Sequence, residues 1–262
     1  MSKKHKEAVQ KQFAKTVEAF AKFAVRDSAN VLAEKVEFAK PQPGDFALDV
    51  ACGPGAFALA LAPRVKFSRG IDLTHEMILQ ARAFQNERNI SNAAFDEGEA
   101  EQLPYPDGIF DLVTCQCSFH HIPKPEMALK EMVRVAKPQG RLAIIDTLGP
   151  ESDSKFELHN RIECLRDPSH TLSLRLTTYL AMIERNGLEI LHQSLKRRKR
   201  SFNQWMLRAG LEPKHKRYAE TRKLLEESVR GDRAGFSAQP QGEDILIVHN
   251  EGMFLLTRKA AE

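Results

Sequence analysis

The first forty residues carry one repeating pattern, in which apolar side chains recur every three or four positions between lysines and glutamates. The apolar positions are Val9, Phe13, Val17, Phe20 and Ala24. This period is that of an amphipathic helix, so residues 1–40 are predicted to be helical. Residues 40–45 hold two prolines and a glycine, which end the helix and begin a turn.

Between residues 41 and 150, short apolar runs alternate with helical patterns. The predicted strands are residues 46–50, 68–73, 93–96, 110–115 and 141–146, and the predicted helices are residues 56–62, 74–87 and 124–136. Strands that are separated by helices pair in parallel, with helices on both faces. We therefore expect an α/β fold with a doubly wound, Rossmann-like sheet.

The pattern changes after residue 150. Residues 151–240 are more polar and show helical periods at 154–165, 177–186, 202–208 and 219–229. Residues 241–262 indicate two apolar strands on either side of a turn at 249–252. These patterns predict a helical cap with part of the closing sheet, and then the final strands, rather than a second independent domain.

The stretch LDVACGPGAFALALA, residues 48–62, joins a predicted strand to a predicted helix through Gly53 and Gly55. Glycine lets a ligand approach the backbone closely, and the free N–H groups of a helix N-terminus attract anions. With Ala58, the turn also satisfies the loose dinucleotide pattern G-x-G-x-x-A. On this motif alone, an NAD-dependent oxidoreductase, another nucleotide-binding enzyme and a turn without a ligand all remain open.

Two acidic residues follow later strands. Asp72 ends the second strand, where it can accept hydrogen bonds from a ribose or cap the next helix beside Thr74. Glu99 lies just past the third strand, where it can accept a proton from an adenine amino group while Ala100 offers its N–H to the ring. A solvated acidic loop fits the second segment equally well.

Four segments then occur together, in the order LDVACGPG, GIDLTHEM, GEAEQLPYPDGIFDLVTCQCSFHHI and RVAKPQGRLAIID. In this order and spacing the sequence resembles the class I S-adenosylmethionine (SAM)-dependent methyltransferases, and within them the methyltransferase type 11 group similar to the ubiquinone and menaquinone C-methyltransferases. The resemblance covers about residues 8–147 and continues more loosely through NRIECLRDPSH. It implies a seven-stranded, mostly parallel sheet with an antiparallel closing strand, N-terminal helices and a cap.

The resemblance also implies SAM as the cofactor. In the family, the glycine turn passes the methionine portion, the acidic residue after the second strand holds the ribose, and the residues beside it line the adenine. The positions implied here are Asp49, Ala51, Gly53, Gly55, Asp72, Leu73, Met77, Glu99, Ala100, Cys115 and Phe20. A helix that precedes the glycine strand closes over the cofactor in this family, which favours the family over a dinucleotide enzyme.

Two positions depart from the family pattern. Gln139 replaces the first glycine of the usual Gly-Gly pair, in a turn that is remote from the chemistry. Phe20 stands where relatives often have Tyr, so a hydroxyl contact from that position is absent. Packing onto the sheet is an equally good interpretation of Phe13 and Phe20.

The candidate residues for the acceptor side follow the fourth strand and continue into the cap. His120 and His121 lie at the carboxyl edge of the sheet, where a histidine is suited to take a proton from a phenol or an activated carbon. Holding the loop or the cofactor is the alternative role. The predicted substrate contacts in the cap are His159, Asn160, Arg166 and His170. Arg166 can instead pair with Asp167, and no histidine spacing typical of a metal site occurs, so we expect no metal.

Composition and charge limit the location and the binding partners that we expect. No run of 18 apolar residues exists, the N-terminus lacks a signal-like segment and the four cysteines form no C-x-x-C, so we expect a cytoplasmic protein without membrane insertion. The net charge of +4 is mild. The basic run 196–200, near Trp205, keeps an RNA methyltransferase as an alternative, but the segment CQCSFHHIP replaces the [DN]-P-P-[YF] motif of base-nitrogen methyltransferases. The sequence therefore predicts an EC 2.1.1 methyltransferase for a small organic acceptor, phenolic or quinone-like; it indicates no oligomeric state.

Overall fold

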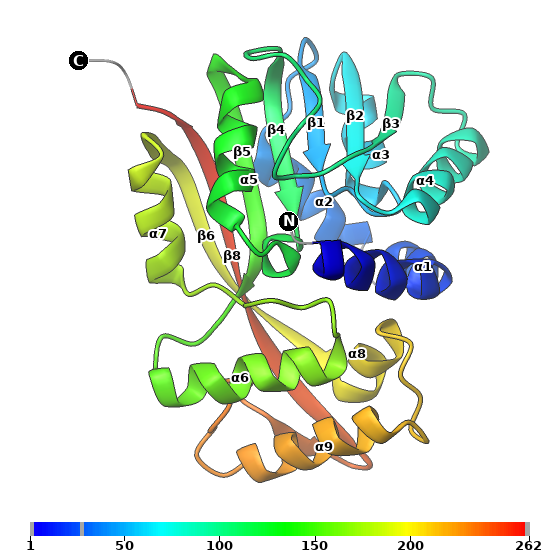
Figure 1. Ribbon diagram of the computed structural model, residues 1–262, viewed down its shortest axis with the longest axis vertical. Coiled ribbons are helices and arrows are strands. Elements are labelled where there is room, and N and C mark those ends of the chain that lie inside the picture. The colour runs from blue at the N-terminus through cyan, green and yellow to red at the C-terminus, as the bar shows by residue number, and fades with distance from the viewer. Residues whose placement is uncertain (1–2, 27–28, 260–262) are drawn as a thin grey trace.

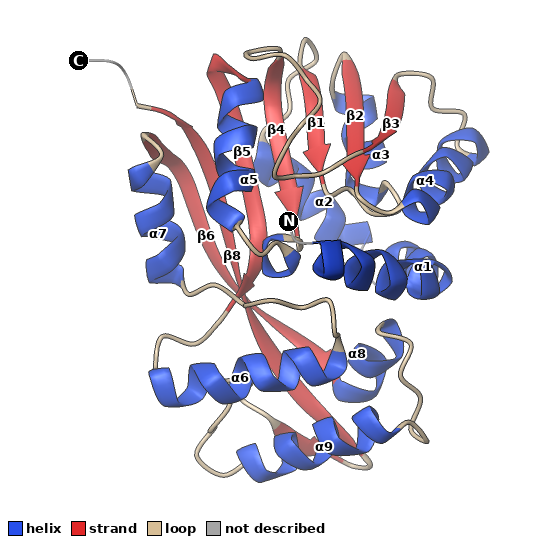
Figure 2. Ribbon diagram, viewed as in Figure 1, coloured by secondary structure: helices blue, strands red, loops and turns tan. Residues whose placement is uncertain are grey.

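The computed structural model describes residues 3–26 and 29–259, with the side chains of residues 4–17 and 30–259. The described residues form one sheet with the strand order β3-β2-β1-β4-β5-β8-β6, to which β7 adds by pairing with β8. Helices cover both faces of the sheet, and the far ends of β6 and β8 extend below it into a cap (Figure 1; Figure 2).

The strands are β1 Phe46–Val50, β2 Phe67–Asp72, β3 Ala93–Glu97, β4 Phe110–Gln116, β5 Ala136–Leu148, β6 Leu188–Ser201, β7 Gln239–Gln241 and β8 Asp244–Arg258. The α-helices are α1 Lys3–Arg26, α2 Ala29–Ala39, α3 Ala56–Leu61, α4 His75–Glu87, α5 Pro125–Val135, α6 Asp153–Arg166, α7 Leu176–Arg185, α8 Phe202–Arg208 and α9 Lys216–Ser228. Two short 3-10 helices are η1 Ala62–Arg64 and η2 Phe119–His121.

The predicted α/β architecture is confirmed. The strands β1 to β5 pair in parallel, and β8 lies antiparallel between β5 and β6. The described sheet has eight strands where seven were expected, and the extra one is the three-residue β7. The parallel order brings the carboxyl ends of β1, β2 and β4 to one edge, and the segments after these strands meet there.

Alternating side chains of the strands supply two apolar layers. Leu48 and Val50 of β1 face the layer that contains Tyr179 of α7, whereas Ala47 faces the layer that contains Phe57 of α3. Because successive strand residues point to opposite faces, one apolar strand can support helices on both sides. The sheet edge that carries the site is therefore held from both faces.

The turn predicted at residues 249–252 is wrong. Residues His249 and Glu251 are buried inside β8, where their side chains are paired with other elements. The hairpin connection lies earlier, at Gly242, where φ is +61° and β7 passes to β8. Tertiary pairing of the polar side chains explains why a segment with turn-like composition continues as a strand.

The cap has its own apolar core. Phe202, Trp205 and Met206 of α8 pack with Phe236 and with Ile247 of β8. Since β6 and β8 pass from the main sheet into this core without a break, the cap is anchored by the sheet itself. The helix α1 contacts α4 on the sheet side and α8 on the cap side, as Figure 1 shows. No helix in the described part of the chain is long and apolar enough to cross a bilayer.

Candidate functional site

A cavity of about 590 Å³ lies along the carboxyl edge of the sheet and extends to the cap. Its walls come from α1 and α2, from the segments after β1, β2 and β4, and from α6, β6, α8 and β8. Its volume falls within the range of ligand sites in proteins, and this edge is where open α/β sheets bind ligands. The cavity thus joins the glycine turn to the cap.

The glycine turn has two glycines with different tasks. Gly55 precedes α3 with φ of +78°, and a Cβ atom there would lie 2.8 Å from the Phe95 ring and from Ala81. Gly53 has φ of +53° and open space beside it, and it lines the cavity. Gly55 therefore serves packing against β3 and α4, while Gly53 leaves room for a ligand.

Asp72 fixes the shape of this turn. Its Oδ2 accepts the N–H of Gly53 at 2.8 Å and its Oδ1 accepts the N–H of Thr74 at 2.9 Å. Each carboxylate oxygen has a second lone pair, so Asp72 can still accept hydrogen bonds from a molecule in the cavity. Burial raises the pKa of Asp72 in spite of these hydrogen bonds.

Asp49 lies on β1, directly before the same turn. The hydroxyl of Thr114 donates to its carboxyl at 2.7 Å. Burial raises the pKa of Asp49 to about 7, and the neighbouring charge of Asp72 contributes in the same direction. Asp49 consequently takes up a proton in the neutral range.

The helix α1 covers the side of the cavity where Leu73 and Glu99 lie. Lys6 forms an ion pair with Glu99, and Gln10 Nε2 donates to the carbonyl oxygen of Leu73 at 3.1 Å. Val9 of the same helix lines the cavity. The carboxylate predicted to contact an adenine is thus held by a cation of the covering helix.

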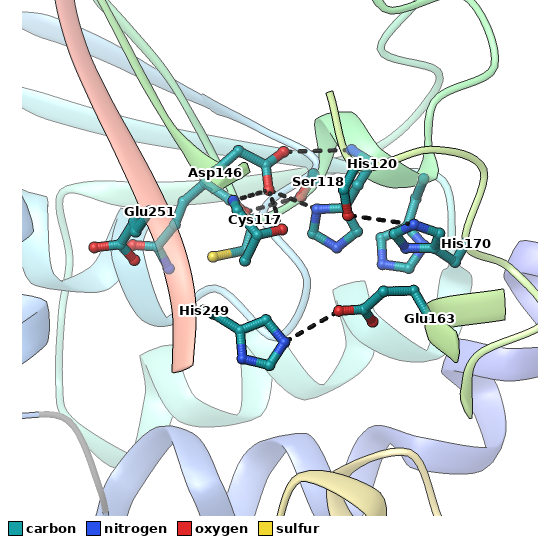
Figure 3. A network of polar contacts seen from close by, with 12 residues as sticks. Cys117, Ser118, His120, Asp146, Glu163, His170, His249 and Glu251 are labelled. Atoms are coloured by element: carbon teal, nitrogen blue, oxygen red, sulfur yellow. Dashed lines mark hydrogen bonds and ion pairs between the residues drawn. The ribbon is translucent and has the colours of Figure 1, made fainter. Parts of the chain in front are cut away.

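His120 lines the cavity and pairs with the buried carboxylate of Asp146 behind it (Figure 3). His120 Nδ1 lies 2.5 Å from Asp146 Oδ1, and the backbone N–H of His120 donates to Asp146 Oδ2 at 3.3 Å. Burial acts to lower the pKa of His120, but the Asp146 charge raises it above its ordinary value. With Nδ1 bound to Asp146, Nε2 is the ring nitrogen that can exchange a proton with a bound molecule.

His121 differs from its neighbour. Its ring makes an edge-to-face contact with Phe13 of α1, with the centroids 5.0 Å apart, and its Nδ1 lies 3.2 Å from Ser169 Oγ. Burial lowers the pKa of His121 to about 4, and the His120 charge acts in the same direction. His121 is therefore neutral at physiological pH and connects the covering helix to the cap.

The cap side of the cavity holds a second buried pair. His249 Nε2 lies 3.1 Å from Glu163 Oε1, and Figure 3 shows this pair facing the His120 region across the site. Glu251, two residues further along β8, forms an ion pair with Lys35 at 2.8 Å. Both carboxylates are buried; Glu251 is neutralised by Lys35, and Glu163 is held by its contact with His249.

The structure brings most of the predicted residues to this cavity. The lining includes Asp49, Ala51, Gly53, Asp72, Leu73, Met77, Glu99, Ala100, His120, His121 and Arg166. Of the expected cofactor positions, Gly55 and Cys115 are not part of the lining, and Cys115 is buried in the sheet core. The side chain of Phe20 lies outside the described residues.

Three predicted cap residues support the wall instead of lining it. His159 Nδ1 lies 3.0 Å from the carbonyl oxygen of Ala234, and its ring stacks on Phe236. Asn160 Oδ1 lies 3.2 Å from His170 Nε2 within the cap. These contacts lie within the cap, and His159 Nε2 is buried without a hydrogen-bond partner among the described residues.

Arg166 does line the cavity, but not as the partner of Asp167. Its Nε donates to the carbonyl oxygen of Trp205 at 3.0 Å, and its guanidinium lies 4.8 Å from the centre of the Trp205 ring. Asp167 accepts hydrogen bonds from the N–H and the hydroxyl of Ser169.

Several residues of the site were missed by sequence reasoning. They are Lys35, Asp146, Glu163, Arg200, His249 and Glu251. Asp146 carried a usable signal, because it ends a buried strand directly beside the strand that leads to His120. Within the described part of the chain, no three His, Cys, Asp or Glu side chains are arranged to hold a metal ion.

Comparison with known proteins identifies the central region. Residues 48–144 match a family model described as a methyltransferase domain. The chain is 39% identical over 141 residues to the uncharacterized methyltransferase YcgJ of Bacillus subtilis, a match that covers 54% of this chain and 56% of that protein. It is 36% identical over 115 residues to the demethylmenaquinone methyltransferase of Lactobacillus johnsonii, covering 42% and 47%. The matches thus span about half the length of these relatives.

Solved structures extend the similarity to the cap. The crystal structure of YcgJ from Bacillus subtilis superimposes with a TM-score of 0.81 at 27% identity, covering 89% of this chain and all of that one. A geranyl diphosphate methyltransferase in complex with SAM shares the fold at 13% identity, with a TM-score of 0.64 over 87% of this chain and 84% of that one. Residues 48–144 are therefore similar to a methyltransferase domain, and the chain shares its fold with solved structures that include a methyltransferase.

Proposed function

We propose that this protein binds SAM in the half of the cavity next to the glycine turn and catalyses methyl transfer to a small organic acceptor. The observation that carries the proposal is that one cavity joins the Gly53–Asp72 turn to the His120–Asp146 pair. The first is a nucleoside-binding element, and the second is a proton acceptor with its orienting carboxylate.

The residues of the cavity fit the cofactor. Asp72 retains lone pairs that can accept the ribose hydroxyl protons, and the open space beside Gly53 admits a ligand against the backbone. Leu73 and Met77 offer apolar surface for a ring, with Ala100 beside them. When bound, SAM would supply a methyl group on a sulfonium. The acceptor atom would attack the methyl carbon in line, and the S–CH3 bond would break so that S-adenosylhomocysteine leaves.

His120 is proposed as the base that takes the acceptor proton. Asp146 holds the imidazole with Nδ1 turned toward the sheet, so that Nε2 accepts the proton released from a hydroxyl or an activated carbon. Tyr179 donates a further hydrogen bond to Asp146 at 3.3 Å, which keeps this carboxylate in place. The rest of the rate enhancement is expected from orientation of the acceptor, which can contribute roughly 7–11 kcal/mol.

The basic run 196–200 does not form a continuous surface for phosphates. The residues alternate along β6, so that Lys196, Arg198 and Arg200 are half-buried while Arg197 and Lys199 are exposed. Arg198 and Lys196 form ion pairs with Glu34. This arrangement supports a small acceptor rather than RNA.

Calorimetric titration with SAM, S-adenosylhomocysteine and NAD tests the proposal. Asp72→Ala is expected to weaken SAM binding at least tenfold. Glu97→Gln is the matched control, because Glu97 pairs in register with Asp72 on the neighbouring strand but is exposed. Binding of NAD without SAM would refute the proposal, as would equal SAM affinity of wild type and Asp72→Ala.

A further inference from the structure

Four arginines line the cavity, and the three besides Arg198 come from three different elements. They are Arg166 at the end of α6, Arg200 near the end of β6 and Arg208 at the end of α8. Arg166 is held in place by the carbonyl oxygen and the ring of Trp205, as described above. Convergence of long cationic side chains on one wall requires a reason, because like charges repel one another.

Arg200 differs from the other basic residues on its face of β6. Lys196 and Arg198 reach Glu34, and Arg198 also reaches Glu251 at 2.8 Å. No ion pair or side-chain hydrogen bond joins Arg200 to another described residue, and its Nε is buried without a partner there. Its register partner on β8 is the apolar Ile247. The row of cations thus ends, beside the cavity, in a guanidinium that forms no ion pair with a carboxylate of the described chain.

The nearby carboxylates are committed elsewhere. Glu251 is shared by Lys35 and Arg198, and Asp167 accepts from Ser169. Glu163 contacts His249 and forms an ion pair with Arg166 at 3.8 Å, so that among the three arginines the described carboxylates reach Arg166 but form no ion pair with Arg200. Burial lowers the pKa of Arg200, and the charges of Arg208 and Arg166 act in the same direction, while Cys117 and Glu251 oppose them. A half-buried cation under such repulsion is costly unless an anion joins it.

We propose that the methyl acceptor carries a carboxylate or phosphate group, and that Arg200 binds this group together with Arg166 and Arg208. Guanidinium groups present N–H donors in a planar fork that fits both anions in a bidentate manner. The anion anchors the acceptor at the cap end, so that its reactive atom faces His120. This inference rests on the proposed methyltransferase function and adds the substrate class.

The family similarity leaves this choice open. The matched methyltransferase domain ends at residue 144, and all three arginines lie beyond it. The acceptor named for the demethylmenaquinone methyltransferases therefore does not transfer to this cap. A neutral quinone-like ring alone would leave Arg200 without an anion.

The test is calorimetry on the full chain saturated with S-adenosylhomocysteine. The probes are inorganic phosphate, 4-hydroxybenzoate and its neutral analogue 4-hydroxybenzamide. We expect saturable binding of either inorganic phosphate or 4-hydroxybenzoate. If 4-hydroxybenzoate is the preferred anion, 4-hydroxybenzamide should bind at least tenfold more weakly than it does. Preference for phosphate or for carboxylate identifies which group the acceptor carries.

Arg200→Gln is expected to weaken the preferred anion at least tenfold. Arg197→Gln is the matched control, because Arg197 belongs to the same basic run but is exposed and donates to Ser237. If the glutamine variant does not fold, as judged by thermal unfolding, Arg200→Lys replaces it and is expected to weaken binding less than tenfold through loss of the fork.

Three results overturn the inference: neither anion binds better than the amide, Arg197→Gln weakens the anion as much as Arg200→Gln, or Arg200→Gln weakens S-adenosylhomocysteine instead. The last result would assign Arg200 to the cofactor carboxylate. If an anion binds through Arg200 but neither SAM nor S-adenosylhomocysteine binds, the anion subsite stands and the proposed methyltransferase function fails.

Discussion

His120 Nδ1 lies 2.5 Å from Asp146 Oδ1, and the two residues come from neighbouring parallel strands or the turn directly after them. Asp146 is fully buried, and four further donors reach it: the backbone N–H groups of His120 and Thr147 and the hydroxyls of Thr147 and Tyr179. His120 holds the pKa of Asp146 below its ordinary value, although burial opposes this. The carboxylate is therefore a fixed negative charge that orients the ring and stabilises its protonated form.

This pair predicts a pH profile. His120 must be neutral to accept a proton, and its pKa is raised above 6.5, so kcat/KM for the acceptor is expected to rise with pH through a value above 6.5. In Asp146→Asn the effect of burial remains without the opposing charge, so the acid limb should move below 6.5. The maximal rate should fall about 10–100-fold, part of the roughly 10²–10⁴ that a general base contributes.

Steady-state kinetics between pH 5 and 9, with Tyr179→Phe as the control, would check this assignment. That control removes a hydrogen bond to Asp146 but no charge, so its acid limb should stay in place. An unchanged acid limb in Asp146→Asn would show that another group titrates.

The covering helix gives a second prediction. Lys6 and Glu99 are each about one-third exposed, so their ion pair contributes at most about 1 kcal/mol. In Lys6→Met, hydrogen exchange of α1 should be up to about fivefold faster, because opening becomes easier by that amount. Saturation with S-adenosylhomocysteine should slow the exchange in wild type and variant alike. Lys11→Met, on the exposed side of the same helix, is the control. Equal exchange rates of α1 in Lys6→Met and Lys11→Met would show that the Lys6–Glu99 ion pair does not hold α1 over the cavity.

The predicted residues that line the cavity lie in motifs that are local in the chain. Gly53 follows β1 and Asp72 is the last residue of β2. Because β1 and β2 pair in parallel, their carboxyl ends lie side by side and the two residues meet. His120 follows β4 in the same way. Local spacing is sufficient for these positions because the fold fixes the rest.

The residues that were missed depend on contacts between distant elements. Asp146 gains its role from a neighbour 26 positions away, once β5 lies beside β4. Arg200 faces the cavity because successive side chains of β6 alternate between half-buried and exposed positions. The run of basic residues in the sequence indicates instead an edge that is solvated throughout. His249 sits in a segment of turn-like composition that becomes a strand through pairing with Glu163. Only tertiary structure supplies this information.

Buried neutral histidines predict weakening of the fold in acid. Burial lowers the pKa of His170 to about 3 and that of His249 to about 4, both below the value of 6.5 in the unfolded chain. The unfolded state therefore binds these protons first, and stability is lost as pH falls from 6.5 toward 4. Each group contributes about 1.4 kcal/mol per pH unit in this window.

Substituting one of these histidines should flatten that dependence. His170→Gln removes one titrating group, so its free energy of unfolding should fall with a slope about 1.4 kcal/mol per pH unit smaller than that of wild type between pH 5.5 and 4. Urea unfolding at a series of pH values measures the slope, with the surface substitution His75→Gln as the control. Parallel curves for wild type and His170→Gln would contradict burial as the cause.

The two glycines of the turn give a matched pair of substitutions. Both have positive φ, so alanine at either position costs about 1–2 kcal/mol of backbone strain. At Gly55 the added methyl would also lie 2.8 Å from the Phe95 ring and from Ala81, which adds about 1–3 kcal/mol of overpacking. Gly55→Ala should therefore lower the free energy of unfolding by about 2–5 kcal/mol, and Gly53→Ala by about 1–2 kcal/mol.

Binding should rank the same two variants in the opposite order. A methyl group at Gly53 would occupy open space of the cavity where a ligand approaches the turn, so Gly53→Ala should lose S-adenosylhomocysteine affinity out of proportion to its stability. Folded Gly55→Ala should retain most of the affinity, because its methyl points into the packing between α3, α4 and β3. Urea unfolding and calorimetry on the same preparations separate the two effects. Loss of affinity that simply follows loss of stability in both variants would mean that neither glycine leaves room for a ligand.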